Sequence, residues 1–589
     1  MILQALTRYY ETLLDLGKIA APGWADAKVA YGLELGDNGE LLDLIPYRQE
    51  EAGSKKSPPH IMKVPMPVKR SVGIAPNFLC DNAGYLLGND NKGKPARTAS
   101  CFAACQALHH KILDGVDCPA AHAVLAFFDT WQPSLAAQHP RLAPEWDKVL
   151  AGVNLIFTYN LQPIYEIAEI RDAWQNYYDS AGGDDENAAI MPCLVTGKIA
   201  PVALIHPSVR GVRDAQSSGA ALISFNAPAF ESYGREQGMN APMSKYAAFA
   251  YTTALNSLLA DREHCTLMGD ATVVCWAEHG SANYQDACMA ALLGTANQKE
   301  TSTITDQDLR SMMGKLASGQ PFIWQDSPLD PDEHFYVLGL APNAARVSVR
   351  FFFSDTFGRF ARNIEQHYKD IEVPRSSRDK YETLPYWKLL DETVNQNARV
   401  KSPSAQMTGD LLRAILTGTP YPATLLNGAN LRIRAEHEVT RGRAAIIKGY
   451  YTRHGHPHCP KEVLEMEDPN TNIPYAMGQL FSVYEQIQLA ANPGINATIK
   501  DKYFNSAAAT PGIIFPILGN LAEKHLRKLT VGKSIYYRQQ IGPLSAVIGK
   551  AYPTRLDLPS QGSFQLGYYY QNMKHFEKKA PEKEETENV

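Results

Sequence analysis

Two segments of this 589-residue sequence carry residue types that could support catalysis, and neither forms a complete site. Residues 88–95, GNDNKGKP, have the GxxxxGK spacing of a loop that binds nucleotide phosphates, but Pro95 stands where a magnesium-binding Ser or Thr is required. We therefore expect that the segment supplies neither the magnesium ligand nor the usual entry into the helix that follows such a loop. The segment 454–459, HGHPHC, could bind a transition metal, yet a structural zinc site needs a second ligand pair, and the sequence contains no CxxC.

Other catalytic patterns are missing from the sequence. It contains no GxSxG motif, no His-Asp dipeptide and no cluster of carboxylates that would hold two metal ions. Cys101 and Cys105 lie four residues apart among alanines, a spacing that favours buried thiols on one helix over redox chemistry. We expect a protein that is not an enzyme and that needs no cofactor or metal.

Positive charge is concentrated in two segments of a chain whose formal net charge is −5. Residues 55–97 contain eight bases and two acids, and residues 432–453 contain six bases and two acids. Contact with phosphates requires clustered Lys and Arg. This distribution favours directed contact with DNA inside a larger assembly over general coating of nucleic acid.

The elements that must position these residues follow from hydrophobic periodicity and turn residues. We predict an amphipathic helix over residues 1–20, a β-hairpin over 24–50, helix from 97 to about 150, β-type runs within 182–240, a helix over 243–260 and a strand pair over 334–352. From about residue 405 the pattern becomes helical. The predicted helices are 405–417, 431–451, 476–491, 496–508, 512–529, 533–551 and 563–578.

The predicted fold class is α+β, with a mixed α/β N-terminal portion followed by an all-α C-terminal bundle. A chain of this length exceeds the roughly 250–300 residues that one hydrophobic core supports, so we expect several domains. We divide it into a mixed α/β region with recognition loops (1–400), a basic helical connector (401–465), a C-terminal helical bundle (466–578) and a disordered tail (579–589).

The region 63–97 is the main candidate for reading DNA. Asn side chains can pair with base edges, Lys and Arg can anchor phosphates, and an aromatic ring can wedge or stack at the fork. Alternatively, PNFLCDN forms a turn whose Asn and Asp side chains bond their own backbone, with Phe78 in the core. The candidates are Lys69, Arg70, Asn77, Phe78, Asn82, Tyr85, Lys92, Lys94 and Arg97.

Three further segments combine cations with other polar residues. The polar, aromatic loop 226–246, with Asn226 and Arg235 as candidates, could contact nucleotides or could only organise the fold. Residues 346–350, RVSVR, place two arginines on one strand face, which could follow a phosphate path or face solvent. In the predicted helix 431–451 and the residues directly after it, Arg434, Arg441, Lys448 and Arg453 share one broad side that could hold a displaced strand or simply be solvated.

Several blocks resemble the large-subunit family of the type I-C CRISPR Cascade complex. They are MILQALTRYYETL with Pro22-Gly23-Trp24, IAPNFLCDNAGYLLG at 74–88, LISFNAPAFESYGREQGMNAPMSKYAAFAYTTALN at 222–256 and FYVLGLAPNAARVSVRFF at 335–352. The resemblance covers the whole chain. It implies a subunit that recognises the protospacer-adjacent motif in double-stranded target DNA, supports R-loop formation and holds the displaced non-target strand.

The resemblance also implies partners and a location. The expected partners are target DNA, crRNA, the backbone, handle-binding and small subunits of Cascade, and a separate helicase–nuclease; the expected location is cytoplasmic, with no membrane contact. In this family the small subunit is commonly made from an internal start, for which Met466 and Met477 are candidates, unless both are ordinary core methionines. Two other hypotheses stay open: a stand-alone metal- or nucleotide-dependent nuclease, and a purely architectural bridging subunit.

Overall fold

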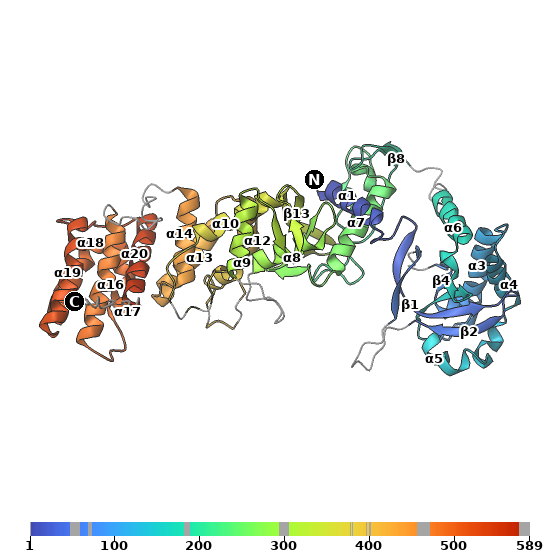
Figure 1. Cartoon of the computed structure of the whole chain (residues 1–589), viewed down its shortest axis with the longest axis horizontal. Helices are drawn as coiled ribbons and strands as arrows, with labels where there is room; N and C mark the ends of the chain where they lie inside the picture. Colours follow the sequence, from blue (N-terminus) through green and yellow to red (C-terminus); the bar gives the residue numbers. More distant parts are fainter. Residues whose placement is uncertain are drawn as a thin grey trace, which may run out of the picture. The chain divides into compact units, whose positions relative to one another are not determined.

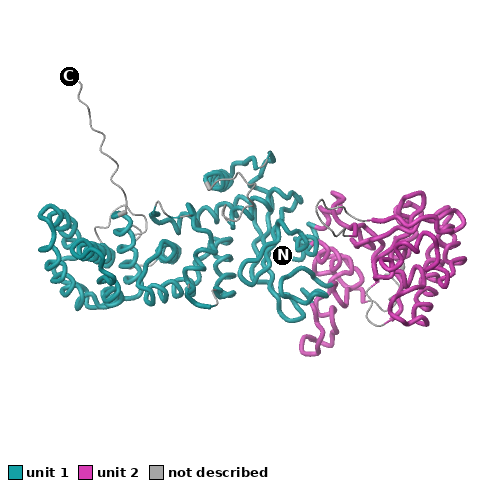
Figure 2. The backbone as a smooth tube through the Cα atoms, turned by 90° about the horizontal axis from the view of Figure 1, so that it is seen from below, with its two compact units in different colours: residues 1–9, 208–223, 255–589 teal, residues 10–207, 224–254 magenta. Residues whose placement is uncertain are grey.

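The computed structural model divides the chain into two compact units, each built from separate stretches of sequence (Figure 2). Unit 1 comprises residues 1–9, 208–223 and 255–589, and unit 2 comprises residues 10–207 and 224–254. The first helix, α1 (Ile2–Asp15), is the amphipathic helix predicted from the sequence. The structure describes residues 2–47, 59–68, 73–181, 189–293, 306–324, 326–376, 379, 381–395, 397–399, 402–455 and 472–576.

Unit 2 contains a six-stranded sheet whose main path runs β2-β1-β5-β4, with β3 paired to β1 and β6 to β5. The helices α3 and α4 pack against each other, and α6 packs against α3 (Figure 1). The strands are β1 (Trp24–Leu35), β2 (Leu41–Pro46), β3 (His60–Pro65), β4 (Cys80–Asp81), β5 (Asn154–Tyr159) and β6 (Gln162–Pro163). The helices are α2 (Ala83–Leu86), α3 (Pro95–Leu113), α4 (Pro119–Thr130), α5 (Trp146–Val149) and α6 (Ala168–Ala181).

The predicted first hairpin is confirmed. The strands β1 and β2 pair antiparallel around the turn at residues 36–39, with Tyr31 opposite Pro46. The turn ends on Gly39, whose φ is +79°, and a Cβ atom there would lie 2.2 Å from the backbone nitrogen of Phe127. Only glycine fits at this position, because both the backbone angle and the close approach to α4 exclude a side chain.

The remainder of unit 2 contains little regular structure before its last helix. Of the β-type runs predicted within 182–240, the described residues form one short strand pair, β7 (Ile190–Pro192) with β8 (Ile199–Pro201), and isolated bridges such as Val209 with Ala220. Frequent Gly and Pro residues keep the rest irregular. The helix predicted over 243–260 is confirmed as α7 (Lys245–Ala260), which continues into unit 1.

Unit 1 begins with a four-stranded antiparallel sheet in the order β14-β13-β10-β9. The predicted strand pair is confirmed, although its turn lies at residues 344–345 because β13 continues through Pro342. Proline is tolerated there because β13 has already passed the end of β10, so no neighbour needs its missing N–H. The strands are β9 (Thr266–Met268), β10 (Ala271–Ala277), β13 (His334–Asn343) and β14 (Arg346–Thr356), with a separate pair, β11 (Phe322–Trp324) and β12 (Ser327–Leu329).

Helices dominate the rest of unit 1, and within the described residues no strand follows β14. One continuous core extends from Met268 to Tyr570. The helices α16, α18, α19 and α20 pack together near the C-terminal end (Figure 1). The helices are α8 (Ala282–Leu293), α9 (Asp306–Ala317), α10 (Phe357–Asp370), α11 (Tyr386–Asp391), α12 (Ala405–Thr417), α13 (Ala423–Glu436), α14 (Arg441–His454), α16 (Ile473–Ala491), α17 (Ile499–Ala509), α18 (Pro511–Leu526), α19 (Val531–Ile548) and α20 (Leu558–Phe576).

The α+β fold class is therefore confirmed, and most helices from α12 onward lie within a few residues of their predicted ranges. The prediction of one helix over 431–451 is wrong. Helix α13 ends at Glu436 and is followed by His437, whose φ is +56°. Helix α14 starts after Thr440, whose hydroxyl caps it by accepting from the Arg443 backbone N–H at 3.2 Å.

The proposed domain boundaries at 400, 465 and 578, and the tail over 579–589, fall outside the described residues and remain predictions. No helix in the part of the chain that the structure describes is long and apolar enough to cross a bilayer.

Candidate nucleic-acid interface

Phe78 lies in the core of unit 2. Its side chain is 1% exposed and stacks on Trp174 with ring centroids 5.2 Å apart and planes inclined by 8°. The next residue, Leu79, has a φ of 54° and donates its backbone N–H to His109 Nε2 at 3.0 Å. Burial lowers the pKa of His109 to about 4, so this imidazole is a neutral acceptor. A ring held in this way cannot stack on a base while the core is intact.

The two asparagines of this segment bond the protein itself. Asn77 Oδ1 accepts from the backbone N–H of Val68 at 2.9 Å, and Asn82 Oδ1 caps α2 by accepting from Gly84 N at 3.0 Å. Tyr85 is 6% exposed. These positions match the alternative interpretation of PNFLCDN as a turn that bonds its own backbone. We therefore interpret Asn77, Phe78, Asn82 and Tyr85 as residues that shape the loop.

Three candidate cations surround the start of α3. Lys92, Lys94 and Arg97 are exposed, and Arg97 Nη2 donates to the carbonyl oxygen of Gly73 at 3.3 Å. The carboxylate of Asp90 lies beside them, but it accepts from Lys92 N at 2.9 Å and Thr98 Oγ1 at 2.8 Å. The other two candidates, Lys69 and Arg70, lie outside the described residues.

The helix predicted from residue 97 is confirmed as α3, but the expectation that Pro95 prevents the usual entry into this helix is wrong. Helix α3 begins at Pro95, because proline needs no N–H at the first helical position. The free N–H groups and the positive end of the helix dipole therefore lie among the three cations, an arrangement that favours phosphate. The missing Ser or Thr still leaves this segment without the magnesium ligand of a nucleotide-binding loop.

A tight turn presents Tyr233 to solvent. Tyr233 and Gly234 have φ angles of 55° and 68°, and Arg235 N donates to Ser232 O at 3.1 Å, as in a two-residue type I′ turn. The amide of Asn240 closes the loop below it: Oδ1 accepts from Ser232 N at 2.9 Å, and Nδ2 donates to Arg235 O at 2.8 Å. Tyr233 is 100% exposed.

This turn is a preorganised feature rather than a packed loop. A tyrosine with positive φ costs roughly 1–2 kcal/mol, and its ring contributes no burial in return. Residues kept in such conformations cluster at functional sites. The surrounding segment is the loop predicted to contact nucleotides, and its candidates Asn226 and Arg235 are both exposed, but Tyr233 was not among the candidates. The signal was the Tyr-Gly pair, typical of a hairpin tip.

The basic side chains predicted to lie on the helix 431–451, together with Arg453 directly after it, mostly bind acceptor groups of the protein itself. Arg441 donates to the carbonyl oxygens of Tyr381 and Glu382 at 2.6 and 2.7 Å, and Lys448 donates to that of Glu372 at 2.6 Å. Arg453 is 6% exposed and pairs with a buried aspartate. The expectation that these cations share one broad side of a single helix is wrong, since α13 carries Arg434 and α14 carries the others.

Two other candidates differ in their accessibility. Arg434, near the end of α13, remains exposed and donates to Gln561 Oε1 at 3.2 Å. On β14, a bulge interrupts the period of two, and Arg350 forms an ion pair with Asp270. The strand therefore does not present a simple row of free arginines.

Metal-binding residues do not gather in the part of the chain that the structure describes. There, no group of three or more His, Cys, Asp or Glu side chains could hold an ion. His454 stacks on Tyr450 with centroids 3.8 Å apart, and residues 456–459 lie outside the described ranges. Cys101 and Cys105 are buried on α3, as predicted.

Comparison with known proteins assigns nearly the whole chain to one protein family. Residues 6–576 match the family model described as CRISPR-associated protein (Cas_Csd1). No curated protein matches the chain. The match covers both units, and the resemblance expected from the sequence blocks is confirmed. The chain therefore belongs to the Csd1 family of CRISPR-associated proteins, the large subunits of type I-C Cascade.

Proposed function

We propose that this large subunit binds double-stranded target DNA, recognises the protospacer-adjacent motif and helps to separate the strands for pairing with crRNA, without catalysing a reaction. In RNA-guided systems base pairing reads the sequence, while protein reads a short motif and stabilises the open strands. The observation that carries the proposal is that unit 2 has both exposed cations at the start of α3 and a tight turn that exposes Tyr233 fully.

The cations provide the phosphate contacts. Lys92, Lys94 and Arg97 lie around free helical N–H groups, and their charges are not neutralised by ion pairs within the described residues. Each phosphate contact contributes about −0.9 to the slope of log K against log salt concentration. Three contacts would therefore contribute a slope of roughly −2.7.

Tyr233 provides the wedge. Apolar and aromatic side chains that enter between base steps unstack them and kink the duplex, at a cost of a few kcal/mol per step. The backbone that carries the ring is already fixed by the turn and by Asn240, so inserting the ring costs little backbone entropy. Arg235 follows the ring directly and is exposed, so it can contact the adjacent phosphate.

The other partners follow from membership of the family. We propose contacts with crRNA, with the backbone, handle-binding and small subunits, with the displaced non-target strand and with the helicase–nuclease in antiviral defence. Of the earlier candidates for the displaced strand, the exposed Arg434 remains in the proposal. Arg441 and Lys448 do not, because backbone carbonyl groups hold them.

For the internal start, we favour Met466 over Met477. Met477 is 0% exposed inside α16, and a chain starting there would lack Tyr475, which belongs to the core, and Asn472, which caps the helix by accepting from Tyr475 N at 3.0 Å. A start at Met466, which lies outside the described residues, keeps all of α16. Immunoblotting of a C-terminally tagged gene should show a short product that Met466→Leu removes; a single full-length band would reject the internal start.

The main test uses guide-loaded complexes on two DNA substrates, a closed duplex bearing the motif and the same duplex opened beforehand by mismatches. Tyr233→Ala should weaken binding to the closed duplex at least tenfold and leave binding to the opened duplex nearly unchanged. Combined Lys92→Ala, Lys94→Ala and Arg97→Ala should weaken both and lower the salt slope by roughly 2.7.

The matched controls are Lys148→Ala and Arg171→Ala, surface cations of the same unit whose side chains are 57% and 55% exposed. They should change neither affinity nor salt slope. Unchanged binding by both test variants would instead favour the purely architectural subunit. Cleavage of DNA by the isolated chain with Mg²⁺ would favour the nuclease.

A further inference from the structure

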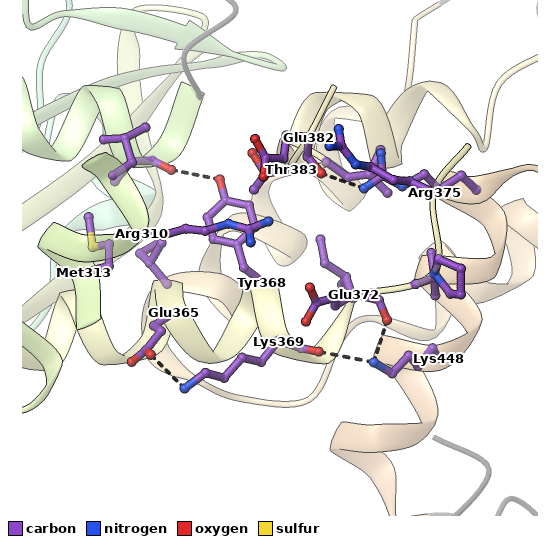
Figure 3. Close-up of a pocket in the computed structure, with 18 residues that line it drawn as sticks. Arg310, Met313, Glu365, Tyr368, Lys369, Glu372, Arg375, Glu382, Thr383 and Lys448 are labelled. Atoms are coloured by element: carbon purple, nitrogen blue, oxygen red, sulfur yellow. Dashed lines mark hydrogen bonds and ion pairs between the residues drawn. The ribbon is translucent and has the colours of Figure 1, made fainter. Parts of the chain in front are cut away.

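A cavity of about 790 Å³ lies within unit 1, far along the sequence from the proposed DNA contacts (Figure 3). Its walls come from α9, from α10 and the residues that follow it, and from the segment that leads into α11; Arg441 and Lys448 of α14 complete it. The volume falls in the range of about 300–1,000 Å³ typical of sites for small molecules. The apolar part of the lining includes Leu309, Met313, Ile364, Val373, Pro374 and Leu384.

Three arginines of the lining carry the argument. Arg441 is fixed by its two bonds to backbone carbonyl groups, and its Nε atom is buried without a hydrogen-bond partner in the described structure. Burial lowers the pKa of Arg441; Asp379 opposes this effect, while Arg375 and Arg310 add to it. Arg310, Arg375 and Arg441 line the same cavity, and the charges of Arg310 and Arg375 each act unfavourably on that of Arg441.

Arg310 and Arg375 make no hydrogen bond or ion pair with any residue that the structure describes, and both are exposed. Five basic and three acidic side chains line the cavity, so its formal charge is +2. One of the acids, Glu365, is already paired with Lys369 at 2.7 Å. Like charges gathered beside an apolar wall are unfavourable in the empty protein, and a bound anion would relieve them.

The remaining polar groups indicate what kind of anion fits. Figure 3 shows Tyr368 on α10 among the lining residues, with its hydroxyl donating to Ala291 O at 3.1 Å, so the ring has a fixed position. Glu372 and Glu382 can accept hydrogen bonds from a ligand's N–H groups. Guanidinium groups bind phosphate in a bidentate manner, and aromatic rings stack on bases.

We propose that this cavity binds a nucleoside phosphate, with Arg310 and Arg375 on the phosphate, the base against Tyr368 and its edge toward Glu372 or Glu382. The ligand is a free nucleotide or one unit of a single strand. An acidic protein segment fits less well, because it would bring further carboxylates to Glu372 and Glu382 without a group to pair with them. This inference concerns residues of unit 1 and does not depend on the DNA contacts proposed in unit 2.

The test titrates the full-length protein by calorimetry with dTMP, dAMP, thymidine, inorganic phosphate and a ten-residue oligothymidylate. One site for a nucleoside monophosphate is expected, with at least tenfold weaker binding of thymidine and of phosphate alone. The double variant Arg310→Gln, Arg375→Gln should weaken nucleotide binding at least tenfold. The matched control Arg359→Gln, an exposed arginine of α10 outside the cavity, should leave it unchanged.

The different probes distinguish a free nucleotide from one unit of a single strand as the ligand. Binding of the oligonucleotide but not of the monophosphates, with the same sensitivity to the double variant, would support a strand nucleotide. Failure of every nucleotide probe, equal binding of phosphate alone, or equal loss in Arg359→Gln would each overturn the proposal. The Tyr233 and α3 variants should bind the nucleotide normally, so failure of the DNA proposal and failure of this one can be distinguished.

Discussion

Replacing Arg453 with methionine tests whether the cations of α14 stabilise the fold. Arg453 Nε donates to Asp370 Oδ2 at 2.7 Å, and the two side chains are 6% and 2% exposed. Its Nη1 donates to the carbonyl oxygens of Ala414 and Thr419 at 2.7 and 2.8 Å. The guanidinium also lies 4.1 Å from the ring centroid of Tyr421. One side chain therefore joins α10, α12, α14 and the residues that follow α12.

The expected cost follows from these contacts. Methionine keeps part of the apolar stem, but it leaves the buried Asp370 carboxylate with Gln366 Nε2, at 2.7 Å, as its remaining side-chain donor. Removing one partner of a buried ion pair costs about 3–5 kcal/mol. The two carbonyl groups that lose a donor add to this. At about 1.4 kcal/mol per factor of ten, local opening should become at least roughly a hundredfold more frequent.

Hydrogen exchange of the full-length protein, measured by mass spectrometry, would detect this change in peptides from α10 and α14. The control Arg538→Met removes a surface pair with Glu523, whose side chains are 53% and 48% exposed, and should cost less than about 1 kcal/mol. The reasoning would be refuted if Arg453→Met left protection of α14 at the level of the control while the assembled complex lost affinity for DNA.

Two further predictions concern unit 1. His264 donates to Asp286 and Asp261 at 2.8 and 2.7 Å, and these bonds raise its pKa to about 9. Its contribution to the free energy of unfolding, at most about 3 kcal/mol, is therefore complete below pH 6.5 and is lost as the pH rises through about 9. The difference in melting temperature between wild type and His264→Gln should shrink over that interval. A difference that stays constant with pH would contradict the assignment. Gly478→Ala would place a Cβ atom 2.0 Å from the carbonyl oxygen of Phe564 and should destabilise the α16–α20 contact by about 1–3 kcal/mol, whereas Gly532→Ala on α19, with nothing within 4 Å, should not lower the melting temperature.

Local patterns predicted α1, the first hairpin, α7, the β13–β14 pair and most helices from α12 onward, but they did not predict β5, β10 or α8 to α10. Helix α12 lies over residues 405–417 as predicted, because its apolar residues recur with the helical period. The break between α13 and α14 was missed, because neither Gly nor Pro marks it and His437 takes the left-handed conformation instead. The sequence blocks also indicated the family correctly.

The candidate functional residues could also be predicted only in part from the sequence. The sequence showed where cations and aromatic residues are plentiful, but it could not show which of them are buried or bonded within the folded protein. Phe78 meets Trp174, 96 residues later, and Arg453 meets Asp370, 83 residues earlier. Contacts between residues so far apart in the sequence depend on how the helices and strands pack, and on the requirement that buried charges and carbonyl groups form hydrogen bonds.

The sequence by itself therefore determined the family, the change from a mixed α/β portion to a helical portion and the two basic segments. Only the tertiary structure decided that Lys92, Lys94 and Arg97 remain available to a phosphate while Arg441 and Arg453 do not. The physical reason is that secondary structure depends on neighbours within a few residues, whereas the availability of a charge depends on every acceptor that the folded chain brings to it.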